Sequence, residues 1–493
     1  MSDRKPSIKK NMIMNAMLEI SKILFPIITY PYVARILHKS GTGKVDFALS
    51  VVTYFGMFAQ LGIPNYGIKA VAKIRDDRQK LSKLVHELLF INLFMAVISY
   101  IAFGASLMIV PRFSRERMLL LVMSAIIFLN AIGIEWLYKG MEMYSYITKR
   151  SILFKFIGLI AMFLMVKSED DYVIYGGITI FATAASDVLN FVNSRKYVDY
   201  KRQKDYNIRQ HLKPVLVFFS MSVAATVYTN LDKVMLGFMK DDAAVGLYGA
   251  SVKIKNILLG LVTSAGTVLL PRASRYVDQG KMDEFYAVLR KTMHLILLAA
   301  IPFCLYFMMY ANEGISFLAG EEYAGSIFPM MIIMPTLVLI GITNISGIQM
   351  MVPLGMEKHV LISEIIGAVI DLVLNAILIP KFSVEGAALG TLAAEIGVTI
   401  YQMYVIKDKP VKLFGEVRFG LIIIASLLGL FAGFWTKFIT FLNHLEADCF
   451  CKLAISASLF FVVYAAIILL AKDSMAQYLL GLVMSKVKRK GKN

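Results

Sequence analysis

Four oxygen-bearing side chains in the second half of the sequence have the types and spacing of a cation site. Asp371 and Asn375 are four residues apart, so a helix would place them on one face. Asp232 lies in the run YTNLDKVMLG, and Thr391 ends the run GAALGT. Carboxylate, amide and hydroxyl oxygens held away from water suit a sodium ion or a proton relay. The alternative is separate packing roles, with Asp232 paired to a lysine such as Lys233.

A second polar group lies near the N-terminus. Asn15, Glu19 and Lys22 recur at steps of three or four residues, which places them on one helix face. A weaker stripe on the next apolar segment contains Asp46, Ser50, Thr53 and Gln60. Ionisable residues inside an apolar segment are costly, so we expect these faces to line a hydrated substrate cavity. The alternative is an internal Glu19–Lys22 ion pair that only stabilises helix packing.

Two further lysines extend this predicted cavity. Lys253 and Lys255 lie inside another apolar segment, and because they are two residues apart they point to different sides of a helix. At most one of them is expected to face the cavity. The predicted substrate-binding set is therefore Asn15, Glu19, Lys22, Gln60, Lys253 and Lys255.

Catalytic motifs are missing from the sequence. It contains no HExxH, CxxC, P-loop, GxSxG or DxD pattern, and its three cysteines and six histidines are scattered. We therefore predict a protein that is not an enzyme and has no cofactor, and coupling to sodium or protons is left open.

The composition indicates the elements that must position these residues. Apolar residues make up 58% of the 493, and charged residues 17%, against about 25% in soluble domains. The mean hydropathy is +0.66. These values exclude a soluble, disordered or disulfide-rich chain and indicate a polytopic membrane protein. The net charge of +18 is then attributed to membrane topology rather than to nucleic-acid binding.

The apolar segments predict an all-α fold with about fourteen transmembrane helices, because each crossing needs about 20 mostly apolar residues. Thirteen is the alternative, since the second and thirteenth segments can be divided differently. The predicted spans are 11–36, 44–64, 84–110, 117–138, 147–166, 172–194, 214–238, 244–270, 288–310, 325–350, 359–380, 384–406, 418–441 and 452–471.

Basic residues predict the orientation. They gather after the second, sixth and eighth spans and in the C-terminal tail, whereas acidic residues such as Glu169 and Glu322 mark the opposite loops. By the positive-inside rule both termini are cytoplasmic. Arg112, Arg115 and Arg117 fit this pattern poorly.

The first twelve spans are interpreted as a parallel repeat. Pro64 and Pro271 end the second and eighth spans, and a basic amphipathic stretch follows each. The predicted domains are an N-terminal lobe of six spans at 1–200, a C-terminal lobe of six at 201–410, and two further helices with a basic tail at 411–493. Repeats of this kind enclose a substrate cavity near the bilayer midplane. The alternative is that ordinary cytoplasmic connections produce the similarity.

Several runs together resemble the Wzx-type polysaccharide flippases. They are ILFPIITYPYVARIL (23–37), GTGKVDFA (41–48), YFGMFAQLGIPNYGIKAVAKIRDD (54–77), YTNLDKVMLG (228–237), VGLYGASVKI (245–254) and VLLPRAS (268–274). The match is close in the first two spans and in the seventh and eighth, and extends to the rest by layout.

This resemblance implies the fold of the MATE exporters and lipid II flippases, with two six-helix lobes in a V around a cavity. It implies an undecaprenyl-diphosphate-linked oligosaccharide as substrate, moved between leaflets of the bacterial plasma membrane. Membrane lipids and polysaccharide polymerase machinery would be partners, and nucleic acid would not.

The resemblance also bears on the candidate sites. In the lipid II branch a sodium site has the residue types of Asp232, Asp371, Asn375 and Thr391, although Asp and Asn are exchanged here along the eleventh span. That branch places arginines on its first two spans, where this sequence has Glu19, Lys22 and Gln60. Lipid II itself is therefore not the expected substrate.

Two other functions compete with lipid-linked oligosaccharide export. A cation-coupled multidrug antiporter of the same fold is disfavoured by fourteen spans rather than twelve and by a basic cavity. A membrane glycosyltransferase or polymerase would need a catalytic acid pair and a sizeable loop outside the membrane.

Overall fold

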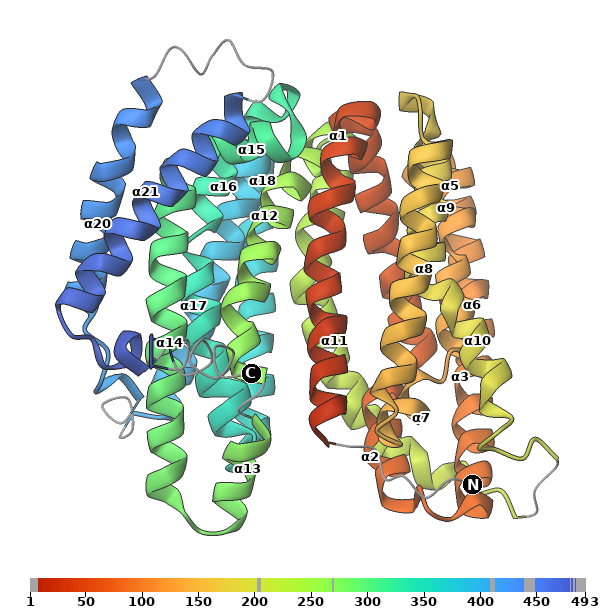
Figure 1. Ribbon diagram of the computed structural model, residues 1–493. Helices are drawn as coiled ribbons and strands as arrows, with labels where there is room; N and C mark the ends of the chain where they lie inside the picture. The colour runs from red at the N-terminus through yellow and green to blue at the C-terminus, as the bar shows by residue number, and fades with distance from the viewer. Residues whose placement is uncertain are drawn as a thin grey trace, which may run out of the picture. The chain divides into compact units, whose positions relative to one another are not determined.

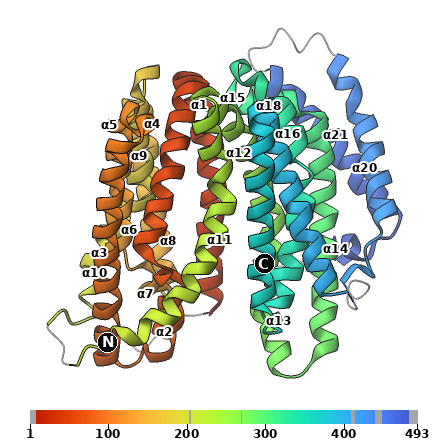
Figure 2. The same ribbon diagram turned by 180° about the vertical axis from the view of Figure 1, so that it is seen from behind.

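The computed structural model describes residues 8–201, 205–267, 270–407, 413–438, 448–478, 480–481 and 484, and every regular element in them is a helix (Figure 1 and Figure 2). Ten helices are long and apolar enough to cross a membrane. The number is eleven if the bent pair Glu321–Ile333 and Thr336–Met351 forms one span. The predicted all-α, multi-span membrane fold is confirmed.

The fourteen predicted segments and these ten or eleven helices differ for two reasons. First, α1 (Ile8–Gln60) has 53 residues and α18 (Glu357–Val405) has 49, each enough for two crossings of about 20 residues. α1 contains non-helical backbone at His38, with φ 56°, and α18 at Ser383, with φ 51°. Both helices therefore fold back into two legs each.

Second, α8 (Tyr144–Met165) is not among the ten although it is 22 residues long. It carries three basic residues, Lys149, Arg150 and Lys155. Once the two folded helices are separated at their breaks and α8 is added, a helix covers each predicted segment.

The chain divides into two compact units. Unit 1 comprises residues 1–249 and 371–387, and unit 2 comprises 250–370 and 388–493. The predicted domain boundaries at residues 200 and 410 stay a prediction.

Unit 1 is built around the two legs of α1, against which α3, α8, α6 and α11 pack (Figure 1). The other elements are α2 (Ile63–Ile74), α3 (Arg78–Ile109), α4 (Pro111–Arg115), α5 (Arg117–Met123), α6 (Ala125–Ile132), α7 (Glu135–Gly140), η1 (Glu169–Asp171), α9 (Tyr172–Ile180), η2 (Phe181–Ala185), α10 (Ser186–Ser194), α11 (Arg209–Met239) and the start of α12 (Asp242–Thr267).

The turn between α2 and α3 shows how local chemistry sets a helix start. The Asp77 carboxylate accepts hydrogen bonds from the backbone amides of Gln79 and Lys80, both 3.1 Å long. These contacts and the Lys80 ammonium lower the pKa of Asp77. Asp77 is thus an N-cap that satisfies two amides which the helix itself leaves without partners.

Unit 2 has its core along α14 (Met282–Met309). Its other elements are α13 (Leu270–Asp278), α15 (Ala311–Ala319), η3 (Glu321–Ser326), α16 (Ile327–Ile333), α17 (Thr336–Thr343), η4 (Asn344–Met351), α20 (Phe419–Phe434), η5 (Trp435–Phe438) and α21 (Asp448–Leu470), together with its parts of α12 and α18.

The last two long helices, α20 and α21, pack on each other and are bound to the core of unit 2 by buried polar contacts. The hydroxyl of Tyr464 donates to the carbonyl of Leu298 at 2.8 Å. His294 on α14 and Asp473, just after α21, lie 3.1 Å apart with fully buried side chains. These contacts hold the C-terminal pair against α14.

Candidate functional site

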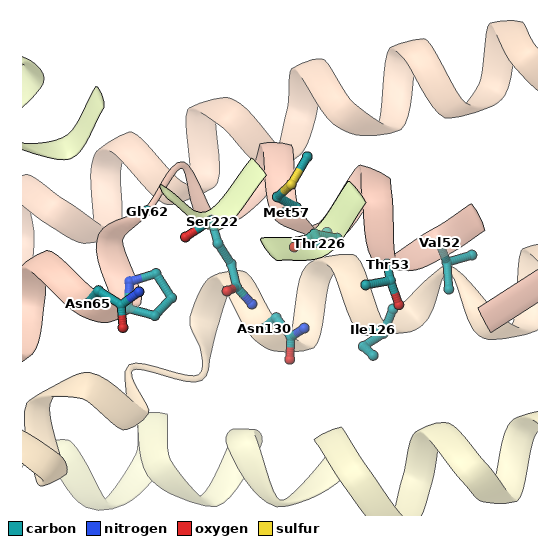
Figure 3. Close-up of a pocket in the computed structure, with 12 residues that line it drawn as sticks. Val52, Thr53, Met57, Gly62, Asn65, Ile126, Asn130, Ser222 and Thr226 are labelled. Atoms are coloured by element: carbon teal, nitrogen blue, oxygen red, sulfur yellow. The ribbon is translucent and has the colours of Figure 1, made fainter. Parts of the chain in front are cut away.

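A pocket of about 320 Å³ lies in unit 1 where α1 ends and α2 begins. Residues of α1, α2, α6 and α11 line it, and Figure 3 shows Asn130 between Asn65 and Thr53, across from Ser222 and Thr226. Small-molecule pockets generally measure about 300–1,000 Å³. The lining residues are Val52, Thr53, Gly56, Met57, Gln60, Gly62, Pro64, Asn65, Ile126, Asn130, Ser222 and Thr226.

The break between α1 and α2 creates one wall of this pocket. Leu61 and Gly62 both have positive φ, 44° and 74°, so the helix cannot continue through them. A Cβ on Gly62 would overlap the backbone nitrogen of Phe219 on α11. Glycine is therefore required here both for the backbone conformation and for close approach of α11.

The predicted face of α1 is polar and accessible. Glu19 and Lys22 form an ion pair of 2.7 Å, with 48% and 57% of their side chains exposed, and Asn15 is half-buried. Lys155 on α8 lies beside this face, since its ammonium donates a hydrogen bond of 2.9 Å to the hydroxyl of Ser21. It also interacts electrostatically with Lys22 and Glu19. Two lysines and one glutamate thus leave a net positive charge.

A third polar region, the buried acid cluster, also belongs to unit 1. The Asp232 carboxylate accepts a hydrogen bond of 2.7 Å from the amide of Asn375 and another from the hydroxyl of Tyr248. Asp371 lies one helical turn before Asn375 on α18. Three of the four predicted cation ligands, Asp232, Asp371 and Asn375, therefore lie close to one another, and all three are buried.

Lys233 does not pair with Asp232 in this arrangement. Its ammonium lies 3.5 Å from the carboxylate of Asp46 on α1. The buried amide oxygen of Asn375 has no hydrogen-bond partner among the described residues. Asn375 thus retains an acceptor that a cation could use.

The remaining predicted residues lie in unit 2. Thr391 is buried on the second leg of α18, and Lys253 and Lys255 are half-buried on α12. The structure does not group them with the unit 1 residues, so their predicted roles stay predictions. In the described ranges, no group of three or more His, Cys, Asp or Glu residues could hold a metal ion.

Thr53 and Gln60 were predicted to line a cavity, but the other polar residues of the pocket were not. Asn130 lies in a predicted span, as does Lys155, so polarity inside an apolar segment was an available signal for both. Ser222 and Thr226 are four residues apart on α11 and share a face. Neither signal shows that these segments meet at one pocket.

Comparison with known proteins relates the chain to proteins of polysaccharide biosynthesis. The family model described as "Polysaccharide biosynthesis protein" matches residues 8–277. A relative from Escherichia coli (strain K12), named "Putative O-antigen transporter", is 25% identical over 410 residues, which are 83% of this chain and 99% of that protein. Its name agrees with the prediction of a transporter rather than an enzyme.

Solved structures show the same fold. A structure of "Lipid II flippase MurJ, inward closed conformation" aligns with a TM-score of 0.68 and 17% identity, covering 94% of this chain and 99% of that one. An inward-facing multidrug resistance MATE family transporter aligns with a TM-score of 0.54 and 14% identity, covering 80% and 98%. The expected fold is confirmed. Because the family model matches more than half of the residues of the chain, the chain belongs to the polysaccharide biosynthesis protein family.

Proposed function

We propose that this protein is a flippase for a lipid-linked oligosaccharide. It moves an undecaprenyl-diphosphate-linked glycan from the inner to the outer leaflet of the bacterial plasma membrane for polysaccharide export. The two units alternate between inward-open and outward-open states, and the polyprenyl tail stays in the lipid.

The pocket is the observation that carries this proposal. Every residue that lines it lies between Val52 and Thr226, within the 8–277 match to the family model. A polar pocket inside a membrane-spanning helical unit is expensive unless it serves a hydrophilic solute. The name of the Escherichia coli relative, an O-antigen transporter, supplies the solute class, a glycan.

Lys22 on α1 and Lys155 on α8 form a basic face that would bind the diphosphate of the carrier lipid. Lys22 and Lys155 carry the positive charge that phosphate oxygens favour. Glu19 holds Lys22 by the 2.7 Å ion pair while no anion is bound. We assign the carrier's diphosphate to this face.

The buried acid cluster provides a coupling site. Asp232, Asp371 and Asn375 would bind sodium or a proton in one conformation more tightly than in the other. A difference in affinity is required, because an ion that binds both states equally shifts neither population.

Depletion of the protein in its own bacterium tests the proposal. Loss should leave lipid-linked oligosaccharide on the inner leaflet and remove the corresponding polysaccharide from the surface. Normal surface polysaccharide together with increased drug sensitivity would favour the cation-coupled multidrug antiporter instead.

A further inference from the structure

The pocket at the α1–α2 break differs from the other polar regions of unit 1 because none of its lining side chains is charged. Its six polar residues are three amides and three hydroxyls: Gln60, Asn65, Asn130, Thr53, Ser222 and Thr226. Elsewhere in the unit, polar residues form charged pairs, such as Lys22 with Glu19 and Lys44 with Glu116.

The amides of the pocket are available for a ligand. Among the residues that the structure describes, the side chains of Gln60, Asn65 and Asn130 make no hydrogen bond to the protein. The hydroxyls of Thr53 and Ser222 donate to carbonyls of their own helices, Leu49 at 2.7 Å and Phe218 at 3.1 Å. Their oxygens therefore remain as acceptors, while each amide offers both donors and an acceptor.

This donor and acceptor set fits one class of ligand. A sugar hydroxyl both donates and accepts, as an amide does, and Met57, Pro64 and Ile126 offer apolar surface to the C–H groups of a sugar ring. A phosphate or a uronic acid would bring a negative charge without a cation among the lining residues. Binding a charge without a partner in a partly buried site is unfavourable.

The Thr53 end of the pocket and Lys22 on the basic face lie at similar depth on the two legs of α1. Lys22 is 16 residues before the His38 break and Thr53 is 15 residues after it, about 22–24 Å along each leg at 1.5 Å per residue. One end of a substrate could therefore occupy the basic face while a neighbouring part enters the pocket.

We infer that the pocket at the α1–α2 break is a subsite for an uncharged sugar of the substrate, and that it selects neutral over acidic glycans. This inference rests on the proposed function, since it assigns one part of the lipid-linked oligosaccharide to this pocket. The preference for neutral sugars follows from the amides that have no protein partner. A sugar that lacks matching hydroxyls, or carries a carboxylate instead, leaves these amides without good hydrogen-bond partners.

Gly56 allows the pocket to be filled without disturbing its walls. A Cβ added to Gly56 meets no atom within 4 Å, so a Gly56→Leu side chain would enter open space. Gly104 on α3 has equally open space around its Cβ position and does not line the pocket, which makes Gly104→Leu a matched control. Asn130→Asp keeps the size of the side chain and adds a negative charge.

The experiment uses full-length protein in vesicles with two probes, undecaprenyl diphosphate carrying a neutral N-acetylhexosamine and the same lipid carrying a hexuronic acid. Wild type should transport the neutral probe faster. Gly56→Leu and Asn130→Asp should lower its rate about tenfold or more, because hydrogen bonds to the amides are lost. Gly104→Leu should transport as wild type does. Unchanged rates in both pocket variants, or faster transport of the acidic probe by wild type, would overturn the inference.

A binding measurement separates this inference from the proposed function. If wild type transports neither probe, the flippase proposal fails. Saturation-transfer NMR with soluble N-acetylhexosamine then tests the pocket alone, in wild type, Gly56→Leu and Gly104→Leu in nanodiscs. Contact signals lost only in Gly56→Leu would support the sugar subsite, and equal signals in all three, or none in wild type, would reject it.

Discussion

The pocket and the buried acid cluster are both polar regions of unit 1, but they satisfy their polar groups differently. The Asp232 carboxylate accepts hydrogen bonds from Asn375 and Tyr248 and is 5% exposed. The amides of Gln60 and Asn130 line an open pocket and have no protein partner among the described residues. Groups bonded to each other hold a conformation, whereas groups without partners are available to a ligand. The difference distinguishes the proposed coupling site from the proposed binding site.

The largest effect on stability is expected in the buried acid cluster, where buried polar groups bond to each other. Asp232→Leu leaves the hydroxyl of Tyr248 and the amide of Asn375 without their acceptor, and we expect a loss of about 2–4 kcal/mol of stability. Thermal unfolding in detergent measures the loss. Asp170→Leu, at an exposed position of η1, is the control and should change stability by less than about 0.5 kcal/mol. Equal melting temperatures for both variants would show that the cluster has no structural role.

Asp371→Asn tests the coupling role without removing a side chain. The variant should lose the effect of sodium or protons on a distance probe between the two units and should still bind substrate. The physical reason is that a neutral amide in place of the carboxylate weakens cation binding. Ion titrations that give the same response in wild type and variant would make these residues purely structural.

The basic face should show an intermediate effect. Lys22→Ala and Lys155→Ala each remove one positive charge from the predicted diphosphate contact, and we expect export to fall about tenfold with normal protein levels. Lys69→Ala, at an exposed position of α2, serves as control. Export by both variants at the control's level would show that the diphosphate binds elsewhere.

A smaller and asymmetric effect is expected at α12. Lys253 and Lys255 point to different sides of their helix, so an alanine at one of the two positions should lower export and at the other should not. Surface polysaccharide in cells carrying each single variant gives the answer. Normal export by both variants would show that neither lysine faces the cavity, and an equal loss in both would contradict the expected asymmetry.

Topology probes should leave activity unchanged. Cysteines introduced as Lys201→Cys and Glu322→Cys should react with an impermeant maleimide from opposite sides of the membrane, because the loops differ in basic content. Cytoplasmic access at residue 201 would fix the predicted orientation of both termini. Same-side labelling would contradict it.

The sequence predicts the fold because apolar length alone marks nearly every span. It also separates the two legs of α1 and of α18, since the predicted spans end at 36 and 380 and resume at 44 and 384, on either side of the breaks at His38 and Ser383. It does not single out His38 and Ser383 as the residues with positive φ. Residue type and spacing also predict Asp232, Asp371 and Asn375 as one polar group. In the structure, Asn375 donates a hydrogen bond to Asp232.

The pocket was harder to predict for a physical reason. Its polar residues come from four helices and are ordinary singly: Asn130 is one amide in an apolar run, and Ser222 and Thr226 are common helix residues. Only the left-handed break at Leu61–Gly62 and the close packing of α11 bring them together. Periodicity within one helix carries no information about which helices meet.

Movement of a glycan-bearing lipid across a bilayer is most directly tested with purified wild-type protein in vesicles that hold a lipid-linked oligosaccharide in the inner leaflet only. Exposure of the glycan is followed by its cleavage with an impermeant glycosidase outside. We predict that cleavage continues to rise with time in wild-type vesicles and is slowed about tenfold or more by Gly56→Leu. Equal cleavage for wild type and Gly56→Leu would contradict the sugar subsite, and cleavage at the protein-free level for wild type would contradict the flippase activity itself.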